Sequence, residues 1–485
     1  MRIPFPKSIP LRPALIFLAL VLFIQLLEDT DPVFAVLMLI AQLAAVEAFN
    51  LMGGMTHMAG AFSLFAILPT VTVPELAHLL LGQPGDFNLE HPLMTAGVCA
   101  VFFTCVMSAA LLVSIARPAQ PLLERFSFSI LELRIISALA CVLAAGIGFT
   151  VLTHGGPPEN GTLLAALNRF SGMFIVMSIM LATYAGLMAT KGRSAMSFYI
   201  VFVLFVAEMA AIMTASKERM LTPVFCWLVV VAACRYRFSR GLGVLVLLGL
   251  GFLVWSFVYP YSQRARFQVG NAPTISDKVS VIIQFIKDRS SFPDTTPNFE
   301  EASAFGTASS QVNIVARFSL LQSIDMLIGA DLKSGYTSID RYAPILVTMV
   351  PHSLWPDRPE VITSNELGYK AGFAVGEDDT TTGLEIGAPA NFFDLGGWTA
   401  LVVYTIICFA LFFFVTVRVV GTTAAGAWAL VPIGMEAHMA GGASLASIFL
   451  TVFMFLSTLG FAIAVLKTVG YIFQTLISRP ISSGA

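Results

Sequence analysis

Apolar stretches long enough to cross a membrane recur along almost the whole chain. A transmembrane helix needs about 20 mostly apolar residues, and about 12 stretches approach that length. The pattern predicts an all-α polytopic membrane protein with about 12 transmembrane helices. The third, eighth and eleventh stretches are short or interrupted. The predicted spans are residues 13–27, 33–52, 57–73, 93–116, 135–153, 171–190, 196–214, 220–234, 241–259, 398–417, 424–436 and 442–466.

One connection between these stretches is far longer than the others. Residues 260–395 form a segment rich in prolines, glycines and charges. The chain therefore divides into residues 1–259 with the first nine predicted helices, the long loop 260–395, and residues 396–485 with the last three helices and a tail. Because short connections suffice to join helices, we expect the function of the protein to reside in the long loop.

Charge alternates between successive connections and predicts how the chain crosses the membrane. Cytoplasmic loops carry an excess of Lys and Arg. The alternation places both termini in the cytoplasm and the long loop outside. The first apolar run lacks a small-residue cleavage site, so we expect it to be retained as a span. The basic connections are residues 1–12, 117–134, 191–193, 235–240, 418 and 467–479, and the acidic ones are residues 28–31, 75–90 and 159.

Composition agrees with a membrane protein and excludes some other classes. Hydrophobic residues make up 57% of the chain and charged residues 12%, about half the charged fraction of an average soluble domain. The net charge of −2 gives no signature of nucleic-acid binding. The 6 cysteines all lie inside apolar stretches or at their ends, so neither a disulfide framework nor a thiolate metal site is indicated.

One basic connection breaks the alternation. Lys217, Glu218 and Arg219 lie between the seventh and eighth predicted spans, on the predicted outer side. Positive charge is disfavoured on that side. One interpretation is an anion site at the membrane surface, because Arg219 opens an apolar helix whose N-terminus is already positive. The other is a helix cap solvated by lipid headgroups.

The long loop has its own helical periodicity. A first helix is predicted after the cap residues Ser276 and Asp277, and a second over residues 310–328, ending at Gly329. On the second helix, Arg317 lies apart from the apolar face. Short amphipathic helices of this kind lie on a membrane surface. We expect them to cover a cavity at the outer leaflet.

A proline-rich ribbon follows these helices. Residues 349–359 read Met-Val-Pro-His-Ser-Leu-Trp-Pro-Asp-Arg-Pro. Each proline fixes its own φ and holds the preceding residue extended, so the ribbon is predicted to be rigid and non-helical. It displays His352, Asp357 and Arg358 beside the indole of Trp355.

The ribbon resembles the Pro-Arg-x-Leu-Trp-Pro-x-Lys-Pro signature of the O-antigen polymerase family, which joins oligosaccharide repeat units. Further features of that family recur in the same order, over residues 215–397. The first half of the chain matches only in hydropathy. The sequence departs from the signature at His352, where the family commonly has Arg. The other matching positions are Arg219, Arg317, Gly335 to Thr337, Glu385 to Gly387 and Asn391 to Phe392.

The resemblance implies a fold similar to the lipid-dependent membrane glycosyltransferases of the C type. It implies transfer of a glycan from undecaprenyl pyrophosphate onto another lipid-linked repeat unit, at the outer face of a bacterial inner membrane. Both substrates and the bilayer are then partners, and a chain-length regulator protein is a further candidate partner. The product is O-antigen or exopolysaccharide.

The leaving group in such a reaction is a lipid pyrophosphate. The chain has no metal-site spacing and no cofactor motif, so cationic side chains are expected to stabilise the developing charge. Arg suits this role because it stays ionised and directs two N–H donors at phosphate oxygens. The pyrophosphate-binding candidates are Arg219, Arg317, Arg266, Arg358 and Lys217.

The acceptor hydroxyl needs a base to take its proton. His352, Glu385 and Asp357 are the candidates, and a lone loop histidine also has a purely structural interpretation. Trp355 is a candidate for stacking on a sugar, although a tryptophan between prolines also anchors loops. Asn391 is a second sugar-binding candidate.

Two other functions compete with polymerisation. An O-antigen ligase, which transfers finished glycan to another acceptor, needs the same arginines and base, but its family resembles the Trp-Pro ribbon less well. A transporter or flippase for a lipid-linked glycan predicts charges at the midplane of paired, broken spans. In this chain the charge concentrates outside the predicted spans.

Overall fold

The computed structural model describes residues 2–116, 120–122, 128–153, 163–265, 268–269, 272, 274–289, 319–337, 355, 364–372, 386–424 and 426–477. The regular structure in these ranges is all helical, as predicted. Among the described residues, 7 helical runs are long and apolar enough to cross a membrane. They are α2 (Pro32–Leu51), α3 to α4 (Met58–Leu80), α5 (Pro92–Ala116), α6 (Ile130–Thr153), Phe170–Ala189 within α7 (Leu163–Ala189), Gly243–Ser262 and α19 (Gly397–Val419).

Two of these runs contain interruptions. The second consists of α3 (Met58–Ile67), the π-helical turn η2 (Leu68–Thr72) and α4 (Val73–Leu80). The sixth lies within α10 (Arg240–Leu253), the π-helical turn η4 (Val254–Val258) and α11 (Tyr259–Arg264). Helices also lie in the remaining predicted ranges: α1 (Leu11–Leu27), α8 (Phe198–Ile212), α9 (Lys217–Ala233), α20 (Leu430–Met439) and α21 (Leu445–Ile477).

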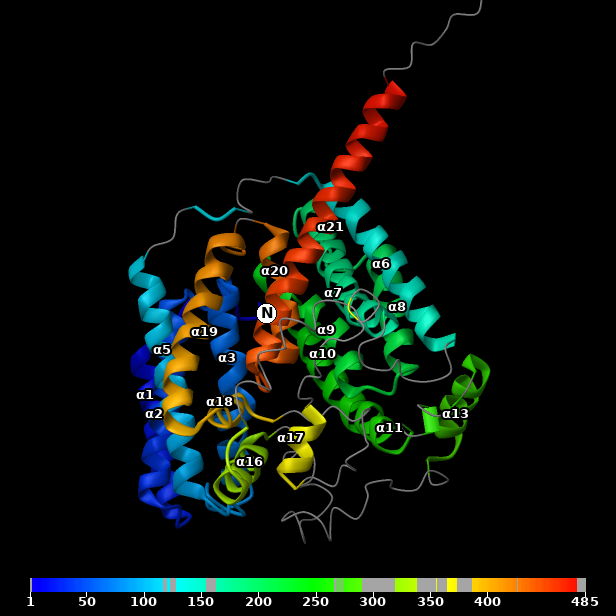
Figure 1. Ribbon diagram of the computed structural model, residues 1–485. Helices are drawn as coiled ribbons and strands as arrows, with labels where there is room; N and C mark the ends of the chain where they lie inside the picture. The colour runs from blue at the N-terminus through cyan, green and yellow to red at the C-terminus, as the bar shows by residue number, and fades with distance from the viewer. Residues whose placement is uncertain are drawn as a thin grey trace, which may run out of the picture.

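The connections between helices gather at two opposite ends of the bundle (Figure 1). At one end, the connection after α4 meets the connection after α1, because Gly85 N donates to Thr30 Oγ1 at 2.8 Å. At the other end, Arg418 Nη1 donates to Gln120 O at 2.9 Å. The acidic connections around Thr30 and Gly85 thus share the first end, and the basic connections around Gln120 and Arg418 share the second. The assignment of the first end to the outside follows from the charge bias alone and stays a prediction.

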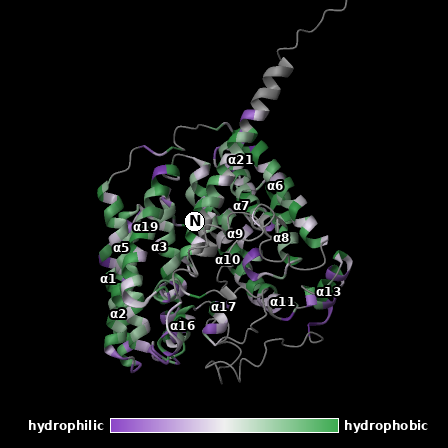
Figure 2. Cartoon of the chain, in the orientation of Figure 1, coloured by the Kyte–Doolittle hydropathy of each residue, from purple (hydrophilic) through white to green (hydrophobic). Residues whose placement is uncertain are grey.

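Four helices of the long loop lie at the first end, the same end of the bundle as α11 (Figure 1). Figure 2 shows hydrophilic residues concentrated there, whereas the bundle helices are mostly hydrophobic. These elements belong to the same end as the acidic connections. They are α13 (Ile275–Lys287), α16 (Leu321–Ser334), α17 (Ser364–Lys370) and α18 (Ala388–Phe393).

Asp325 attaches α16 to the bundle. Its buried carboxylate accepts hydrogen bonds from Glu90 N at 2.7 Å, His91 N at 3.0 Å and Thr95 Oγ1 at 2.7 Å. These donors lie at the N-terminus of α5, where unpaired N–H groups and the helix dipole favour a negative charge. One helix of the long loop therefore caps a candidate membrane span.

A proline explains a second attachment. In the π-helical turn η2, the N–H of Val73 bonds to Leu68 O. The next N–H in that register would bond to Pro69 O, but residue 74 is Pro74, which has no N–H. Leu320 N takes the place of the missing donor and bonds to Pro69 O at 2.8 Å. The start of α16 thus satisfies a carbonyl that the span itself cannot satisfy.

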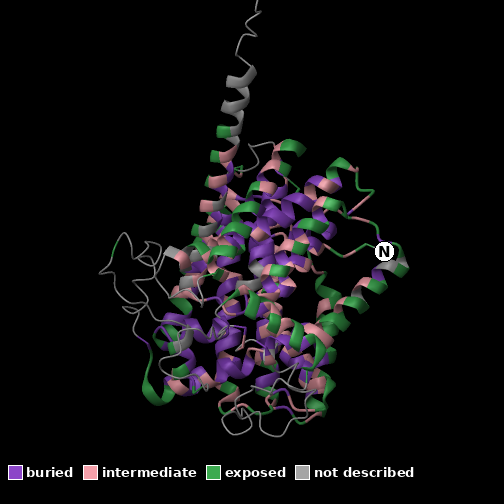
Figure 3. Ribbon diagram, turned by 90° about the vertical axis from the view of Figure 1, so that its right-hand side faces the viewer, coloured by how far each residue is buried: buried purple, intermediate pink, exposed green. Residues whose placement is uncertain are grey.

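The buried side chains form two main clusters, one on each side of the bundle. The first joins α2, α3, α5 and α19 to the loop helices α16 and α18, and the second joins α6, α7, α8, α9 and α20. Phe392 of α18 lies with its ring 5.7 Å from Phe102 of α5 and 5.7 Å from Phe409 of α19. Figure 3 shows the buried residues along the middle of the bundle. Part of the long loop therefore belongs to the buried core of the protein instead of only lying over its surface.

Three sequence expectations are corrected by the structure. Glu75 was expected in a connection but lies in α4, 2% exposed, because the helix continues past Pro74, and its carboxylate accepts from Gln42 Nε2. The cap of α13 is Thr274, whose Oγ1 accepts from Asp277 N at 3.1 Å, rather than Ser276 or Asp277. The helix expected over residues 310–328 corresponds to α16, which begins only at Leu321 and continues past Gly329 to Ser334. Gly329 packs against His91 on the face toward α5.

α13 presents two apolar faces. Phe285 is fully buried, with its ring 5.2 Å from that of Tyr261 at the end of a candidate span. Ile283 and Ile286 lie on a neighbouring stripe of the helix and are 47% and 61% exposed. An uncovered apolar stripe on a helix attached to the end of a membrane span suits the lipid headgroup boundary.

We expect a nitroxide label at Ile286 to lie in the boundary layer of a lipid nanodisc and to collide more with oxygen than with a water-soluble nickel chelate. A label at the exposed Gln284, on the far side of α13, serves as the matched control and should favour the nickel chelate. Equal, water-like collision rates at both positions would show that α13 stands away from the bilayer.

Candidate functional site

The structure describes four of the ten candidate site residues. Trp355 is 44% exposed. Lys217, Arg219 and Asn391 lie on described helices. The other six, which include the three candidate bases, lie outside the described residues and stay predictions: His352, Glu385, Asp357, Arg317, Arg266 and Arg358.

Arg219 and Lys217 open α9 at the same end of the bundle as the loop helices. Ser216 caps this helix, with Oγ accepting from Arg219 N at 3.4 Å, and both basic side chains are exposed. The turn before α9 is held by Tyr261 of α11, whose hydroxyl donates to Ile212 O at 2.8 Å. Exposed cations at a helix N-terminus suit an anionic group.

Asn391 lies inside the protein, where α18 meets a break between α20 and α21. Its Nδ2 donates to Ile386 O at 3.0 Å and to Gly442 O at 3.2 Å. Ala388 N donates to Gly441 O in the same break, at 3.0 Å. The Oδ1 atom of Asn391 is buried and has no partner among the described residues. The amide nitrogen of Asn391 therefore joins the loop to the bundle, while its Oδ1 atom accepts no hydrogen bond from the described residues.

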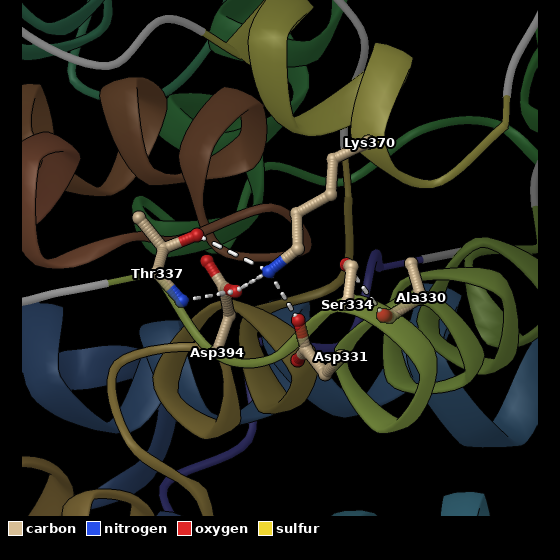
Figure 4. Close-up of polar contacts among 6 residues, drawn as sticks. All are labelled: Ala330, Asp331, Ser334, Thr337, Lys370 and Asp394. Carbon is tan, nitrogen blue, oxygen red and sulfur yellow. Dashed lines mark hydrogen bonds and ion pairs between the residues drawn. The ribbon is translucent and has the colours of Figure 1, made fainter.

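A polar cluster that sequence reasoning missed joins three parts of the long loop (Figure 4). Lys370, at the end of α17, donates from Nζ to Asp331 Oδ1 at 2.5 Å, Asp394 Oδ1 at 2.6 Å and Thr337 Oγ1 at 3.2 Å. Thr337 N donates in turn to Asp394 O at 2.9 Å and Asp394 Oδ1 at 3.1 Å. We call these four residues the Lys370 clasp. An ammonium has three N–H donors, and all three are used.

The clasp contains one more negative group than positive groups. The side chains of Asp331 and Asp394 are fully buried, and that of Lys370 is 20% exposed. Burial, together with the neighbouring Asp394 carboxylate, raises the pKa of Asp331 to about 8. Burial opposes ionisation of Asp394 as well, but hydrogen bonds from Asp331 and Lys370 keep the pKa of Asp394 below its ordinary value. The raised pKa of Asp331 favours its protonated form near neutral pH, which reduces the excess negative charge of the cluster.

Glycines shape the backbone around the clasp. Gly335 ends α16 with φ +85°, in the left-handed region that favours glycine, and turns the chain toward Thr337. Tyr336 then packs edge-on against Phe393 with ring centroids 5.5 Å apart. A Cβ on Gly397, where φ is +70°, would meet the Tyr336 ring at 2.9 Å. The absence of a side chain at Gly397 thus leaves room for Tyr336, where the turn after α16 crosses the start of α19.

Only part of the clasp left a signal in the sequence. Thr337 belongs to the Gly-x-Thr passage noted above, and Asp394 follows directly after Asn391 to Phe393. Asp331 and Lys370 stand in no recognisable motif. Their pairing depends on the tertiary approach of α16 and α17, which spacing along the chain does not reveal.

The described residues contain no group of three or more His, Cys, Asp or Glu side chains that could hold a metal ion. Comparison with known proteins finds no matching family model, no matching curated protein and no matching solved structure.

Proposed function

We propose that this protein polymerises undecaprenyl-pyrophosphate-linked repeat units at the outer face of a bacterial inner membrane. We also propose that α1, α8, α9, α20 and α21 cross the membrane with the 7 longer runs, which gives twelve spans with both termini in the cytoplasm. The proposed fold is that of a C-type membrane glycosyltransferase. The proposal is supported by the sequence of the proline-rich ribbon, residues 349–359, and by the contacts that attach helices of the long loop to the bundle.

The observation that carries this proposal is the insertion of the loop into the helix bundle. α16 caps α5 through Asp325 and satisfies Pro69 O, and Phe392 of α18 packs in the core. A loop that only linked two spans would not need such attachments. A loop that forms an enzyme site on a lipid surface does need them, because catalytic groups must be held in fixed positions.

In the proposed reaction, an acceptor hydroxyl oxygen bonds to the anomeric carbon of the donor glycan, and the bond from that carbon to the pyrophosphate oxygen breaks. The hydroxyl proton goes to a base, for which His352, Glu385 and Asp357 are the candidates. The electron pair leaves with undecaprenyl pyrophosphate. Arg219 and Lys217 lie where exposed cations can stabilise that charge.

A lipid-linked glycan transporter is the second candidate, because one described feature favours it. The carboxyl group of Glu75 is buried within a candidate span and bonded by Gln42. Ionisable residues within spans often mark transport pathways. A ligase, by contrast, is supported by no described feature that a polymerase does not share.

Deletion of the gene, followed by gel analysis of surface glycan, tests the proposal. A polymerase predicts loss of the ladder of long chains while single repeat units still reach the surface. Loss of all attached glycan with accumulation of lipid-linked polymer would indicate a ligase. Loss of every glycan from the surface, single units included, would indicate a transporter.

A further inference from the structure

Tyr261 holds the turn that precedes α9. Its side chain is fully buried, and its hydroxyl donates to Ile212 O, the last carbonyl of α8, at 2.8 Å. Ala215 N donates to the same carbonyl at 3.0 Å. Ile212 O therefore accepts two hydrogen bonds, one that closes the turn and one that joins the turn to α11. The first turn of α9 follows directly and carries the two described candidate cations, Lys217 and Arg219.

The backbone of this turn needs contacts that hold it. Ala215 has φ +47°, in the left-handed region that residues other than glycine rarely adopt. Its methyl group is fully buried, so the residue packs inside the protein in this conformation. Such a conformation persists where the surrounding structure determines it. The hydrogen bond from Tyr261 to Ile212 O is a described contact of that kind.

The ring of Tyr261 joins the same turn to α13, which lies beside α11 (Figure 1). It stacks on Phe257 with ring centroids 5.2 Å apart, and the ring of Phe285 on α13 meets it edge-on, also at 5.2 Å. Tyr261 and Phe285 belong to one buried cluster with Ala215 and Met220, which flank the two cations in the sequence. Contacts between described residues thus run from α13 through Tyr261 to the start of α9.

We propose that Tyr261 is a positioning residue that fixes the first turn of α9 against α13, so that Lys217 and Arg219 are presented together to the phosphate groups of a lipid-linked substrate. The inference rests on the proposed function, which assigns a pyrophosphate to these cations. Tyr261 itself touches no substrate. It acts through Ile212 and the turn, because a hydroxyl has one proton to donate and the bond to Ile212 O uses it.

α13 relates this positioning to the membrane surface. Its exposed apolar stripe, with Ile283 and Ile286, suits the headgroup boundary, which is also the layer of lipid phosphates. Phe285 lies on the buried side of the same helix and contacts Tyr261. A helix seated at that boundary therefore joins the start of α9 to the layer in which a lipid-linked pyrophosphate lies.

The test compares Tyr261→Phe with Tyr199→Phe as matched control, in purified full-length protein. Tyr199 lies at the other end of α8, with its hydroxyl 2.8 Å from Ser137 Oγ on α6, so both substitutions remove one hydrogen-bonded hydroxyl. Phe285→Leu is a second variant, which stays apolar but removes the ring contact from α13. Nanodiscs of zwitterionic phosphatidylcholine keep anionic headgroups from competing with the probe, undecaprenyl pyrophosphate.

We expect Tyr261→Phe to speed amide hydrogen exchange in peptides covering residues 213–219, because the turn loses one of its holding contacts. Binding of undecaprenyl pyrophosphate should weaken about 3- to 10-fold, the usual size of one neutral hydrogen bond, and kcat with lipid-linked single repeat units should fall by a similar factor. Phe285→Leu should act in the same direction, and Tyr199→Phe should change none of the three. Wild-type exchange and affinity in Tyr261→Phe would overturn the inference.

A double-mutant cycle separates positioning from a general loss of stability. If Tyr261 acts through the cations, Tyr261→Phe should cost little further affinity once Arg219→Ala has removed the main contact with the probe. Losses that simply multiply in the double variant would contradict the inference. Wild-type protein that binds the probe but forms no polymer would refute the proposed polymerisation, and exchange and the binding cycle would still decide the role of Tyr261.

Discussion

Asp331→Asn is expected to stabilise the protein above pH 8 and to leave its stability almost unchanged near pH 5. The pKa of Asp331 is raised from an ordinary value of about 3.9 to about 8 in the folded protein. Between these values folding takes up a proton, so the stability of the wild type falls as pH rises and stops falling above about pH 8. Asn does not titrate and removes this loss.

The size of the effect follows from the raised pKa. One pKa unit corresponds to about 1.4 kcal/mol, so we expect a gain of more than about 2 kcal/mol at pH 8.5. Near pH 5, Asn resembles the protonated acid in shape and hydrogen bonding, and the change should stay below about 1 kcal/mol. The other charged groups of the clasp do not interfere, because the pKa of Asp394 is lowered and that of Lys370 is raised.

Thermal unfolding of the detergent-solubilised protein between pH 5 and 9 provides the measurement. Glu90→Gln is the matched control, since Glu90 is an exposed carboxylate that pairs with Lys333 on α16, and its curve should run parallel to that of the wild type. Parallel curves for Asp331→Asn and the wild type would mean that Asp331 is ionised in the folded protein at neutral pH.

Arg219→Ala is expected to reduce polymer formation by about 10²- to 10³-fold, the usual effect of removing one group that stabilises developing negative charge. Arg219→Lys should retain part of the activity, because it keeps the charge but loses the forked donors that match a pyrophosphate. The side chain is exposed at the start of α9. The substitution should therefore leave folding intact.

Complementation of the deletion strain, scored by glycan gel, measures this effect. Arg193→Ala is the matched control, because Arg193 is an exposed arginine in the connection between α7 and α8, on the predicted cytoplasmic side. A full ladder from Arg219→Ala at wild-type protein levels would remove Arg219 from the pyrophosphate site.

The helices could be predicted from the sequence because a run of apolar residues leaves the backbone in lipid no alternative to a helix. α5 and α19 agree with their predicted ranges within a few residues. The position of Glu75 could not be predicted, because its burial in a span depends on a polar partner, Gln42, that lies on another helix. Likewise, the sequence predicted Ser276 or Asp277 as the cap of α13, but Thr274 caps this helix. Several neighbouring side chains are of types that can cap a helix, so the sequence alone does not decide among them.

The candidate site could be predicted less well than the helices. The sequence drew attention to Asn391 as a sugar-binding candidate, and the structure shows its amide nitrogen joining α18 to the break before α21, a contact that the sequence did not indicate. The Lys370 clasp escaped notice because charged residues in a long loop are usually solvated, and only the tertiary approach of α16 and α17 buries these ones. Pairing across the fold carries no local periodicity.

Reconstitution of the purified protein in liposomes with lipid-linked single repeat units tests the central claim most directly. The account predicts a ladder of longer lipid-linked glycans and one undecaprenyl pyrophosphate released for each bond formed. Unchanged single units, or their transfer only to an added lipid A core acceptor, would contradict it.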